Sequence, residues 1–200
     1  MLGEAFLCLL LNKMSSNPQP KKIVILSDGK PGHYNQSLGI MDQLSDDEYQ
    51  LVEINFRSKW HDNILRIFLS LFPGGKLTDK VIWSILFFSL TEETISKLKN
   101  IQSVALILST GSSVAAVNLL LGQLLDAKTV TCRPPSPVGT RQFDLAILPR
   151  LYWRQPERIN VCRTLGVPNR ISPERLEHFR PLSQKVSSSQ RSKIGLLIGG

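Results

Sequence analysis

The residues of this sequence best suited to chemistry lie in a short segment that follows an apolar run. The segment reads SDGKPGHYNQ over residues 27–36. Gly29 and Gly32 permit positive φ and close approach of the backbone to a ligand. His33 is the one histidine of the segment, and a histidine suits a general base, a donor to a sugar or phosphate, or a side chain satisfied within its own loop. The remaining side-chain donors of the segment are Lys30, Asn35 and Gln36.

Two further segments carry groups that suit an anion or a sugar. STGSS at residues 109–113 offers Gly111, Ser112 and the free N–H groups of a helix start, although helix capping accounts equally well for its serines. CRPPSPVG at residues 132–139 predicts a rigid, extended loop that presents Arg133. Cys132 has no His or Asp beside it in the sequence, and we interpret it as a small buried residue rather than a nucleophile.

These three segments each follow a predicted strand. Apolar or alternating runs predict strands at residues 22–27, 49–55, 103–109, 128–132 and 143–148. The pattern predicts helices at residues 36–44, 91–99 and 114–125. Residues 64–72 and 81–90 are strongly apolar, and 81–90 is predicted to be either a buried helix or a hydrophobic surface helix. The alternation defines an α/β fold with a Rossmann-like, doubly wound parallel sheet. Ligands of such sheets bind beyond the carboxyl ends of the strands, which is where the three segments belong.

Composition is that of a globular protein, with 42% hydrophobic and 20% charged residues. The three cysteines, Cys8, Cys132 and Cys162, lie far apart and form neither a disulfide framework nor a CxxC metal site, which favours a reducing, cytoplasmic compartment. The sequence contains no P-loop, GxGxxG, GxSxG or HExxH motif. We therefore expect no metal and no bound cofactor.

Charge is distributed unevenly along the chain. Residues 1–100 hold 11 basic and 11 acidic side chains, whereas residues 101–200 hold 13 and 5, so the second half carries the whole net charge of +8. Ten of those 13 are arginines, whose planar fork suits phosphate and carboxylate. This half predicts an anionic partner or a merely solvated basic face. An aromatic content of 7% argues against nucleic acid.

The pattern divides the chain into four parts. Residues 1–21 are expected to be a flexible segment, whose apolar run at 5–11 is too short to span a bilayer. That run is either upstream of a true start at Met14 or a weak membrane-surface anchor. Residues 22–183 form the predicted domain, with an Arg- and Pro-rich connector from about 151. Residues 184–193 are a predicted linker, and 194–200 the first strand of a truncated second domain.

Five blocks in this order resemble a known family. They are SDGKPGHYNQSLGI, STGSS, RPPSPVGTRQFDLAILP, NVCRTLGVPNRISPERL and the terminal IGLLIGG. Together they resemble the mitochondrial-fission family named after the plant elongated-mitochondria factor, whose bacterial members are labelled nucleoside-diphosphate-sugar epimerases or glycosyltransferases. The absence of GxGxxG argues against the epimerase label. Where the family pattern often carries a His-Asp pair, this chain has Pro149-Arg150-Leu151-Tyr152.

The resemblance implies a GT-B-like architecture of two Rossmann-like domains, of which this chain is the N-terminal, acceptor-side part. It implies transfer of a sugar from a nucleotide sugar to a hydroxyl acceptor, including a lipid-linked one, with His33 as the base. The backbone could approach the substrate closely at Gly29, Gly32 and Gly111. The side chains that would orient substrate or diphosphate are those of Lys30, Asn35, Gln36, Ser112 and Arg133. The alternatives are a non-catalytic adaptor that docks on the anionic inner leaflet through its basic half and residues 81–90, or an inactive fragment.

Overall fold

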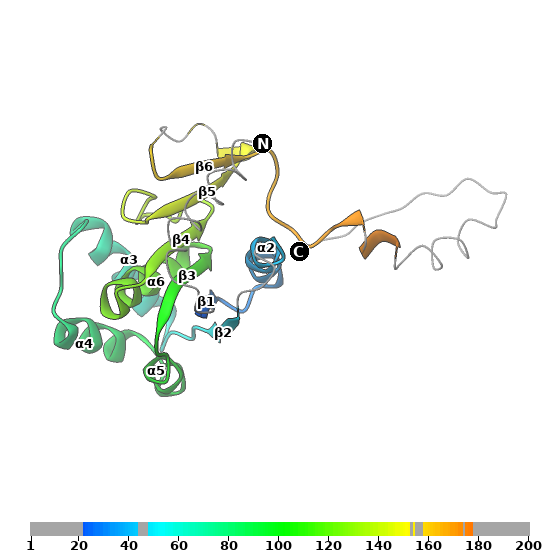
Figure 1. The fold of residues 1–200 in the computed structure, drawn as a ribbon. Helices are drawn as coiled ribbons and strands as arrows, with labels where there is room; N and C mark the ends of the chain where they lie inside the picture. The colour runs from blue at the N-terminus through cyan, green and yellow to red at the C-terminus, as the bar shows by residue number, and fades with distance from the viewer. Residues whose placement is uncertain (1–21, 44–47, 153, 155–157, 174, 178–200) are drawn as a thin grey trace. The chain divides into compact units, whose positions relative to one another are not determined.

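Six parallel strands form one sheet in a computed structural model of the chain, which describes residues 22–43, 48–152, 154, 158–173 and 175–177. The strand order is β2-β1-β3-β4-β5-β6 (Figure 1). The strands are β1 (Lys22–Ser27), β2 (Tyr49–Glu53), β3 (Val104–Thr110), β4 (Lys128–Cys132), β5 (Leu145–Pro149) and β6 (Val161–Thr164). The predicted α/β class and Rossmann-like parallel sheet are thus confirmed.

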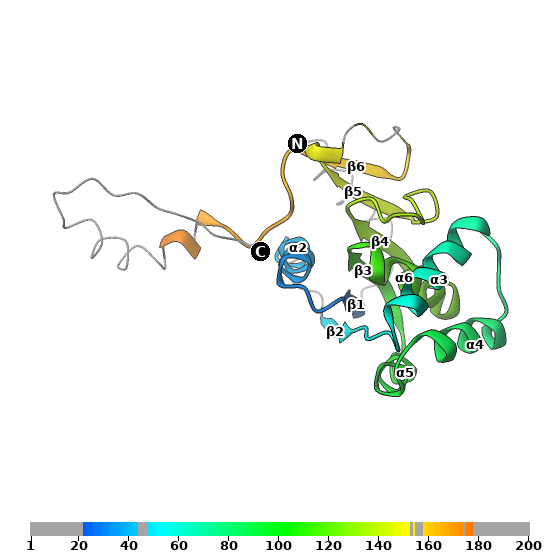
Figure 2. The same cartoon turned by 180° about the vertical axis from the view of Figure 1, so that it is seen from behind.

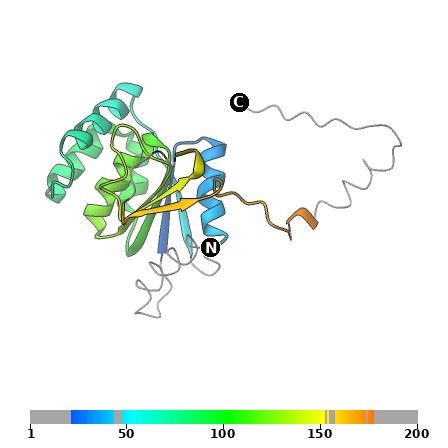
Figure 3. The same ribbon diagram turned by 90° about the horizontal axis from the view of Figure 1, so that it is seen from above.

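Helices cover the two faces of this sheet unequally. They are α2 (Pro31–Met41), α3 (Lys59–Leu71), α4 (Asp79–Ser89), α5 (Glu92–Lys99) and α6 (Ser112–Leu125), followed by the short 3₁₀ helix η1 (Arg150–Tyr152). Figures 2 and 3 show α2 on one side of the sheet and α3 to α6 on the other.

The core follows from the alternation of side chains along the strands. In β1, Val24 and Leu26 point into the cluster formed with α3 to α6, whereas Ile23 and Ile25 join the cluster that contains Leu38 of α2. Both faces of β1 are therefore buried, as its continuous β-branched run predicts.

Helix α2 begins five residues earlier than predicted and ends three residues earlier. The expected span was 36–44, whereas the helix runs from Pro31 to Met41. Proline is well suited to the first helical position, because its φ is already helical and its missing N–H would have no partner there. Gly32, His33 and Asn35 therefore belong to the first turns of a helix and not to a loop.

Other boundaries also differ from the predictions. Helices α3 and α4 begin before the apolar runs at residues 64–72 and 81–90, with Asp62 and Asp79 in their first turns, where the helix dipole favours acids. Strand β6 lies inside the Arg- and Pro-rich connector, in which no strand was predicted. It pairs with β5 and buries Cys162.

The described chain divides into a unit that ends at Asn169 and a second unit that begins at Arg170. In the second unit, Ser172 Oγ accepts the backbone N–H of Arg175 at 3.2 Å, a contact typical of a helix N-cap. Residues 1–21 and 184–200, and with them the predicted terminal segment, linker and extra strand, lie outside the described residues. Within the described ranges, no helix combines the length and apolarity needed to cross a membrane.

Candidate functional site

The strand order places a natural ligand site between β1 and β3. From β1 the sheet continues to β2 on one side and to β3 on the other, so the segments after β1 and β3 diverge at this point. Doubly wound sheets bind ligands at such a switch point, at the carboxyl ends of the strands. The predicted site residues lie in the segments that directly follow β1, β3 and β4.

A histidine–carboxylate pair occupies this edge of the sheet. His33, in the first turn of α2, places Nδ1 2.9 Å from Oδ2 and 3.1 Å from Oδ1 of Asp28, which follows β1 directly. The Asp28 and His33 side chains are only 7% and 17% exposed. A carboxylate accepts hydrogen bonds, so Nδ1 carries a proton, and in the neutral imidazole Nε2 then carries the lone pair.

Arg133 contacts the other nitrogen of the same imidazole. Its Nη1 lies 3.2 Å from His33 Nε2. A guanidinium only donates hydrogen bonds, so this contact independently assigns Nε2 as the acceptor. Arg133 also donates from Nε to Tyr152 Oη at 2.9 Å and from Nη2 to the same oxygen. The result is a continuous chain of four side chains from Asp28 through His33 and Arg133 to Tyr152.

Arg133 holds this position with an unusual backbone conformation. It follows the buried strand β4 with φ at +76°, a value that costs a non-glycine residue free energy and recurs at functional sites. Its N–H is satisfied by Ile147 O at 2.9 Å. The loop after it was predicted to be extended, but it turns, with Gly139 N donating to Pro135 O at 2.6 Å.

Gly111 lets the histidine approach β3. Its φ is +103°, and a Cβ atom there would stand 2.6 Å from His33 Nδ1. Gly29 also has a positive φ, of +75°. Gly32 differs from both, because no atom lies within 4 Å of the place its Cβ would occupy, so this side of α2 is open.

The remaining predicted residues lie around this chain of contacts or further along α2. Lys30 Nζ is 3.3 Å from Asp28 Oδ2, and Ser112 Oγ accepts the N–H of Ser136 at 3.1 Å. Asn35 is exposed, whereas Gln36 Oε1 lies 3.8 Å from Cys132 Sγ. The structure thus brings together His33, Lys30, Gly111 and Arg133. Ser112 follows Gly111 directly in the sequence.

Cys132 is buried, as the sequence predicted. Burial raises the pKa of its thiol to about 12, although the charge of Arg133 and a hydrogen bond with Thr110 act in the opposite direction. A thiol in this state is a poor nucleophile at neutral pH.

Sequence reasoning missed two members of the site, Asp28 and Tyr152. Asp28 was part of the quoted segment, and Pro31 was the signal that a helix starts soon enough to turn His33 back onto it. Tyr152 stands in the stretch where the family pattern often carries a His-Asp pair, and its partner Arg133 is 19 residues away in sequence.

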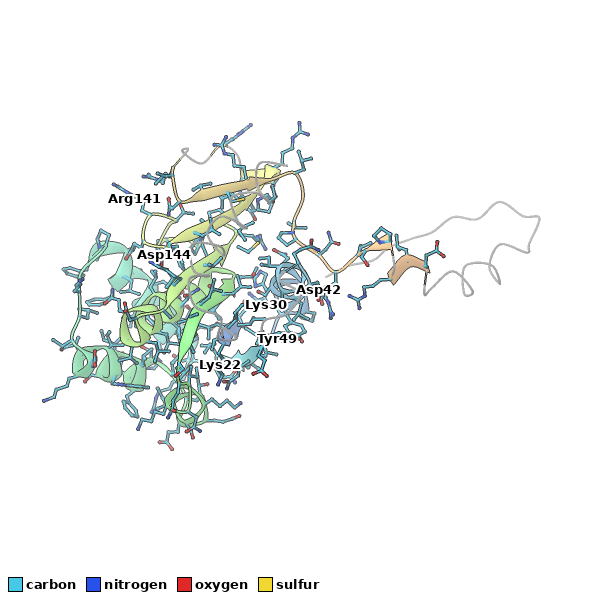
Figure 4. All side chains as sticks on the ribbon, in the orientation of Figure 1. Lys22, Lys30, Asp42, Tyr49, Arg141 and Asp144 are labelled. Carbon is cyan, nitrogen blue, oxygen red and sulfur yellow. The ribbon has the colours of Figure 1, made fainter. Side chains whose placement is uncertain are left out.

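A second feature lies at the opposite edge of the sheet. A cavity of about 410 Å³ is lined by α3, the start of β4 and the residues before β5. Lys128 Nζ and Asp144 Oδ1 form an ion pair of 2.8 Å there, and Figure 4 labels Asp144. The charged side chains that line this cavity include both acids and bases, whereas those at the switch-point edge are mainly cationic. No three His, Cys, Asp or Glu side chains gather to hold a metal ion in the described part of the chain.

Fold and site together define a doubly wound α/β protein with a histidine–carboxylate pair at its switch point. The family described as Mitochondrial fission ELM1 matches residues 31–200, and the chain belongs to that family. The family resemblance noted from the sequence is therefore confirmed. No curated protein and no solved structure matches the chain.

Proposed function

We propose that this chain is the acceptor-side part of a nucleotide-sugar-dependent glycosyltransferase with GT-B-like architecture. One observation carries the proposal: Asp28 fixes the His33 tautomer so that a basic nitrogen, Nε2, faces the carboxyl edge of the sheet. A histidine held in this way by a carboxylate is a recurrent general-base arrangement.

The proposed step is a displacement at the anomeric carbon of the sugar. His33 Nε2 takes the proton of an acceptor hydroxyl while that oxygen bonds to the anomeric carbon. The bond from this carbon to the diphosphate oxygen breaks, and the nucleoside diphosphate leaves with the bonding electron pair. Asp28 stabilises the imidazolium that forms. As the resemblance implies, the nucleotide would be held by a second domain that begins near residue 194.

Binding and turnover test the proposal separately. The full-length protein, including the second domain that would hold the nucleotide, is titrated with UDP-, GDP- and ADP-sugars by thermal shift, and release of the nucleoside diphosphate is then measured with an acceptor panel. We expect one donor to raise Tm saturably. His33→Gln should retain that shift but lose about 10²–10⁴-fold in turnover, the usual contribution of a general base.

His61 supplies the matched control. Its Nδ1 bonds to Ser58 Oγ at 2.8 Å at the start of α3, and it is not part of the chain of contacts from Asp28 to Tyr152, so His61→Gln should turn over like the wild type. Full activity in His33→Gln would remove the base assignment. The absence of any donor-induced shift in the wild type would remove the transferase proposal.

A second candidate function is docking on an anionic membrane surface. Helix α3 exposes an apolar strip at helical spacing, formed by Trp60, Ile64, Ile67 and Leu71, of which Trp60 is 76% exposed. Monomeric proteins seldom leave such a continuous strip in water. Exposed lysines flank the strip in the sequence, Lys59 before it and Lys76 and Lys80 after it. Apolar side chains flanked by lysines fit the interface of an anionic bilayer.

The expected docking segment, residues 81–90, divides between core and surface. Ile82 and Leu86 of α4 are buried, whereas Val81, Phe87 and Phe88 are exposed. The Phe88 ring lies 4.9 Å from that of His61, so the exposed side of α4 adjoins the start of the α3 strip.

Vesicle sedimentation tests this second candidate. The chain should bind phosphatidylglycerol-containing vesicles and not pure phosphatidylcholine, and salt should weaken the binding. The double change Trp60→Ser and Ile67→Ser should abolish it, whereas Ile159→Ser, at a 93% exposed position outside the strip, should not. Equal binding by both variants would exclude α3 as the docking surface.

A further inference from the structure

We propose that Arg133 is an anion-operated cover on the His33 base, so that a phosphoryl group of the substrate draws the guanidinium away and frees Nε2. The identity of the freed nitrogen as a catalytic base rests on the proposed function. The movement itself and its dependence on an anion rest on contacts around Arg133 alone.

The proposed base, His33 Nε2, already accepts a hydrogen bond in this structure. His33 Nε2 has one lone pair, and Arg133 Nη1 donates to it at 3.2 Å. The same lone pair cannot take a proton from a hydroxyl while it accepts this hydrogen bond. His33 Nδ1 offers no substitute, because its proton is held by Asp28 at 2.9 Å. Proton transfer to His33 therefore requires that Arg133 moves.

Arg133 is held in place by neutral groups only. Its side-chain partners are His33 Nε2 and Tyr152 Oη. Across the described ranges, no carboxylate lies within 4.0 Å of its guanidinium, and Asp28 pairs with His33 and Lys30 instead. Hydrogen bonds between a guanidinium and an oxyanion are roughly twice as strong as those to neutral acceptors. An oxyanion beside Arg133 therefore competes well for it.

The surroundings of Arg133 favour a phosphoryl group. Three of the five guanidinium N–H groups are used by His33 and Tyr152, so two are left for a ligand. Lys30, whose side chain is 64% exposed, stands on the other side of His33, and the space beside Gly32 is open. The two remaining N–H groups of the planar guanidinium match a group with two or three charged oxygens. Its source is either a phosphate on the acceptor or the diphosphate of the donor.

Nitrogen NMR of the whole chain, labelled with ¹⁵N-histidine, reads the cover directly. The sequence has three histidines, and His33→Gln assigns the His33 signals. Methyl phosphate stands for an acceptor phosphate and UDP for the donor diphosphate. We expect a saturable shift of His33 Nε2 toward a lone pair without a hydrogen bond, while Nδ1 stays protonated.

Variants separate the cover from other effects. Arg133→Gln should show the uncovered Nε2 signal without ligand and lose the response to anions. Tyr152→Phe removes the Oη anchor, so it should shift Nε2 part of the way toward the uncovered signal and need less anion to complete the shift, which tests the proposal even where Arg133→Gln fails to fold. Arg141→Gln removes an exposed charge near the opposite edge (Figure 4) and should behave as the wild type.

Each result has a defined meaning. A response to methyl phosphate that Arg133→Gln lacks supports the proposal with the phosphate on the acceptor, and a response to UDP alone supports it with the donor diphosphate. No response to either probe, or an unchanged response in Arg133→Gln, overturns the proposal. Uncovering by phosphate without any sugar transfer leaves this inference standing and removes the proposed function. Transfer without uncovering removes only this inference.

Discussion

Gly111 is the single residue on which the histidine pair depends most directly. A Cβ atom at this position would stand 2.6 Å from His33 Nδ1 and 3.5 Å from Asp28 Oδ2, and φ is +103°. We expect Gly111→Ala to lower the free energy of unfolding by about 1–3 kcal/mol, because it adds backbone strain to a steric clash. It should also separate His33 from Asp28. Chemical denaturation and the His33 Nδ1 resonance measure the two effects.

Gly32 is the matched control for this change. It lies in the first turn of α2, and no atom stands within 4 Å of the place that a Cβ atom would occupy. Because alanine favours the helical state over glycine by roughly 0.5–1 kcal/mol, Gly32→Ala should leave stability unchanged or raise it. Equal losses in both alanine variants would contradict the role assigned to Gly111.

Cys132 gives a prediction of chemical reactivity at the same scale. With its pKa raised to about 12 by burial, its thiolate is scarce at pH 8. We expect iodoacetamide to leave Cys132 unmodified in the native chain and to modify it in 6 M guanidinium (roughly the range that unfolds stable domains). Mass spectrometry of the peptides distinguishes the two states. Rapid native alkylation would show that this thiol is accessible and ionisable.

At the scale of elements, the sequence predicted the central strands well and the site only in part. Runs such as KIVILS identify buried strands because β-branched apolar residues suit strands covered on both faces. The start of α2 was missed because Pro31 and Gly32 usually signal a loop, yet proline at the first helical position is favourable. Strand β6 was missed because its sequence, VCRT, is short and only Cys162 is buried.

The same limits explain what was missed in the site. His33 and Arg133 were recognisable as chemical groups, but their contact joins segments 100 residues apart and depends on the placement of β1, β3 and β4. Asp28 becomes the partner of His33 only when α2 begins at Pro31. Tyr152 reaches Arg133 because β4 and β5 are neighbours in the sheet. Such pairings are set by tertiary structure and leave no local pattern.

Asp144 ties the start of β4 to the residue before β5, which gives a prediction about these elements. Its carboxylate accepts from Lys128 Nζ at 2.8 Å, from Thr129 N at 2.9 Å and from Thr129 Oγ1 at 3.0 Å. We expect Asp144→Asn to cost about 1–3 kcal/mol at pH 7, because hydrogen bonds to a charged acceptor are weakened. Urea denaturation at several pH values measures this cost.

The pH dependence of that cost has a definite sign. Burial acts to raise the pKa of Asp144, but the hydrogen bonds from Lys128 and Thr129 outweigh it, so the pKa is lowered in the folded chain. Stabilisation by the carboxylate is therefore complete above its unfolded pKa of about 3.9 and is lost as pH falls through the lower folded value. The difference between wild type and Asp144→Asn should shrink below about pH 4. A difference that grows in acid would contradict the lowered pKa.

At the scale of the whole molecule, the parallel sheet separates two edges with different chemistry. The carboxyl edge collects Lys30, His33 and Arg133, which supply cations and a base. The amino edge contains the cavity with the Lys128–Asp144 pair, whose charges offset each other. Because every strand runs in the same direction, each segment that follows a strand adds to the first edge and each that precedes one adds to the second. An anionic substrate is therefore expected at the carboxyl edge alone.

Hydrogen exchange of the whole chain tests this assignment without reference to any single side chain. The nucleotide sugar that raises Tm most, or UDP where none does, is added at saturation. We expect slower exchange in three segments far apart in sequence, at residues 28–34, 111–114 and 133–136, because a ligand at the switch point touches the ends of β1, β3 and β4 together. Residues 74–77 and 142–144, which line the cavity at the other edge, should exchange as before. Protection confined to those cavity residues would move the binding site to the opposite edge of the sheet and leave the His33 pair with a structural role.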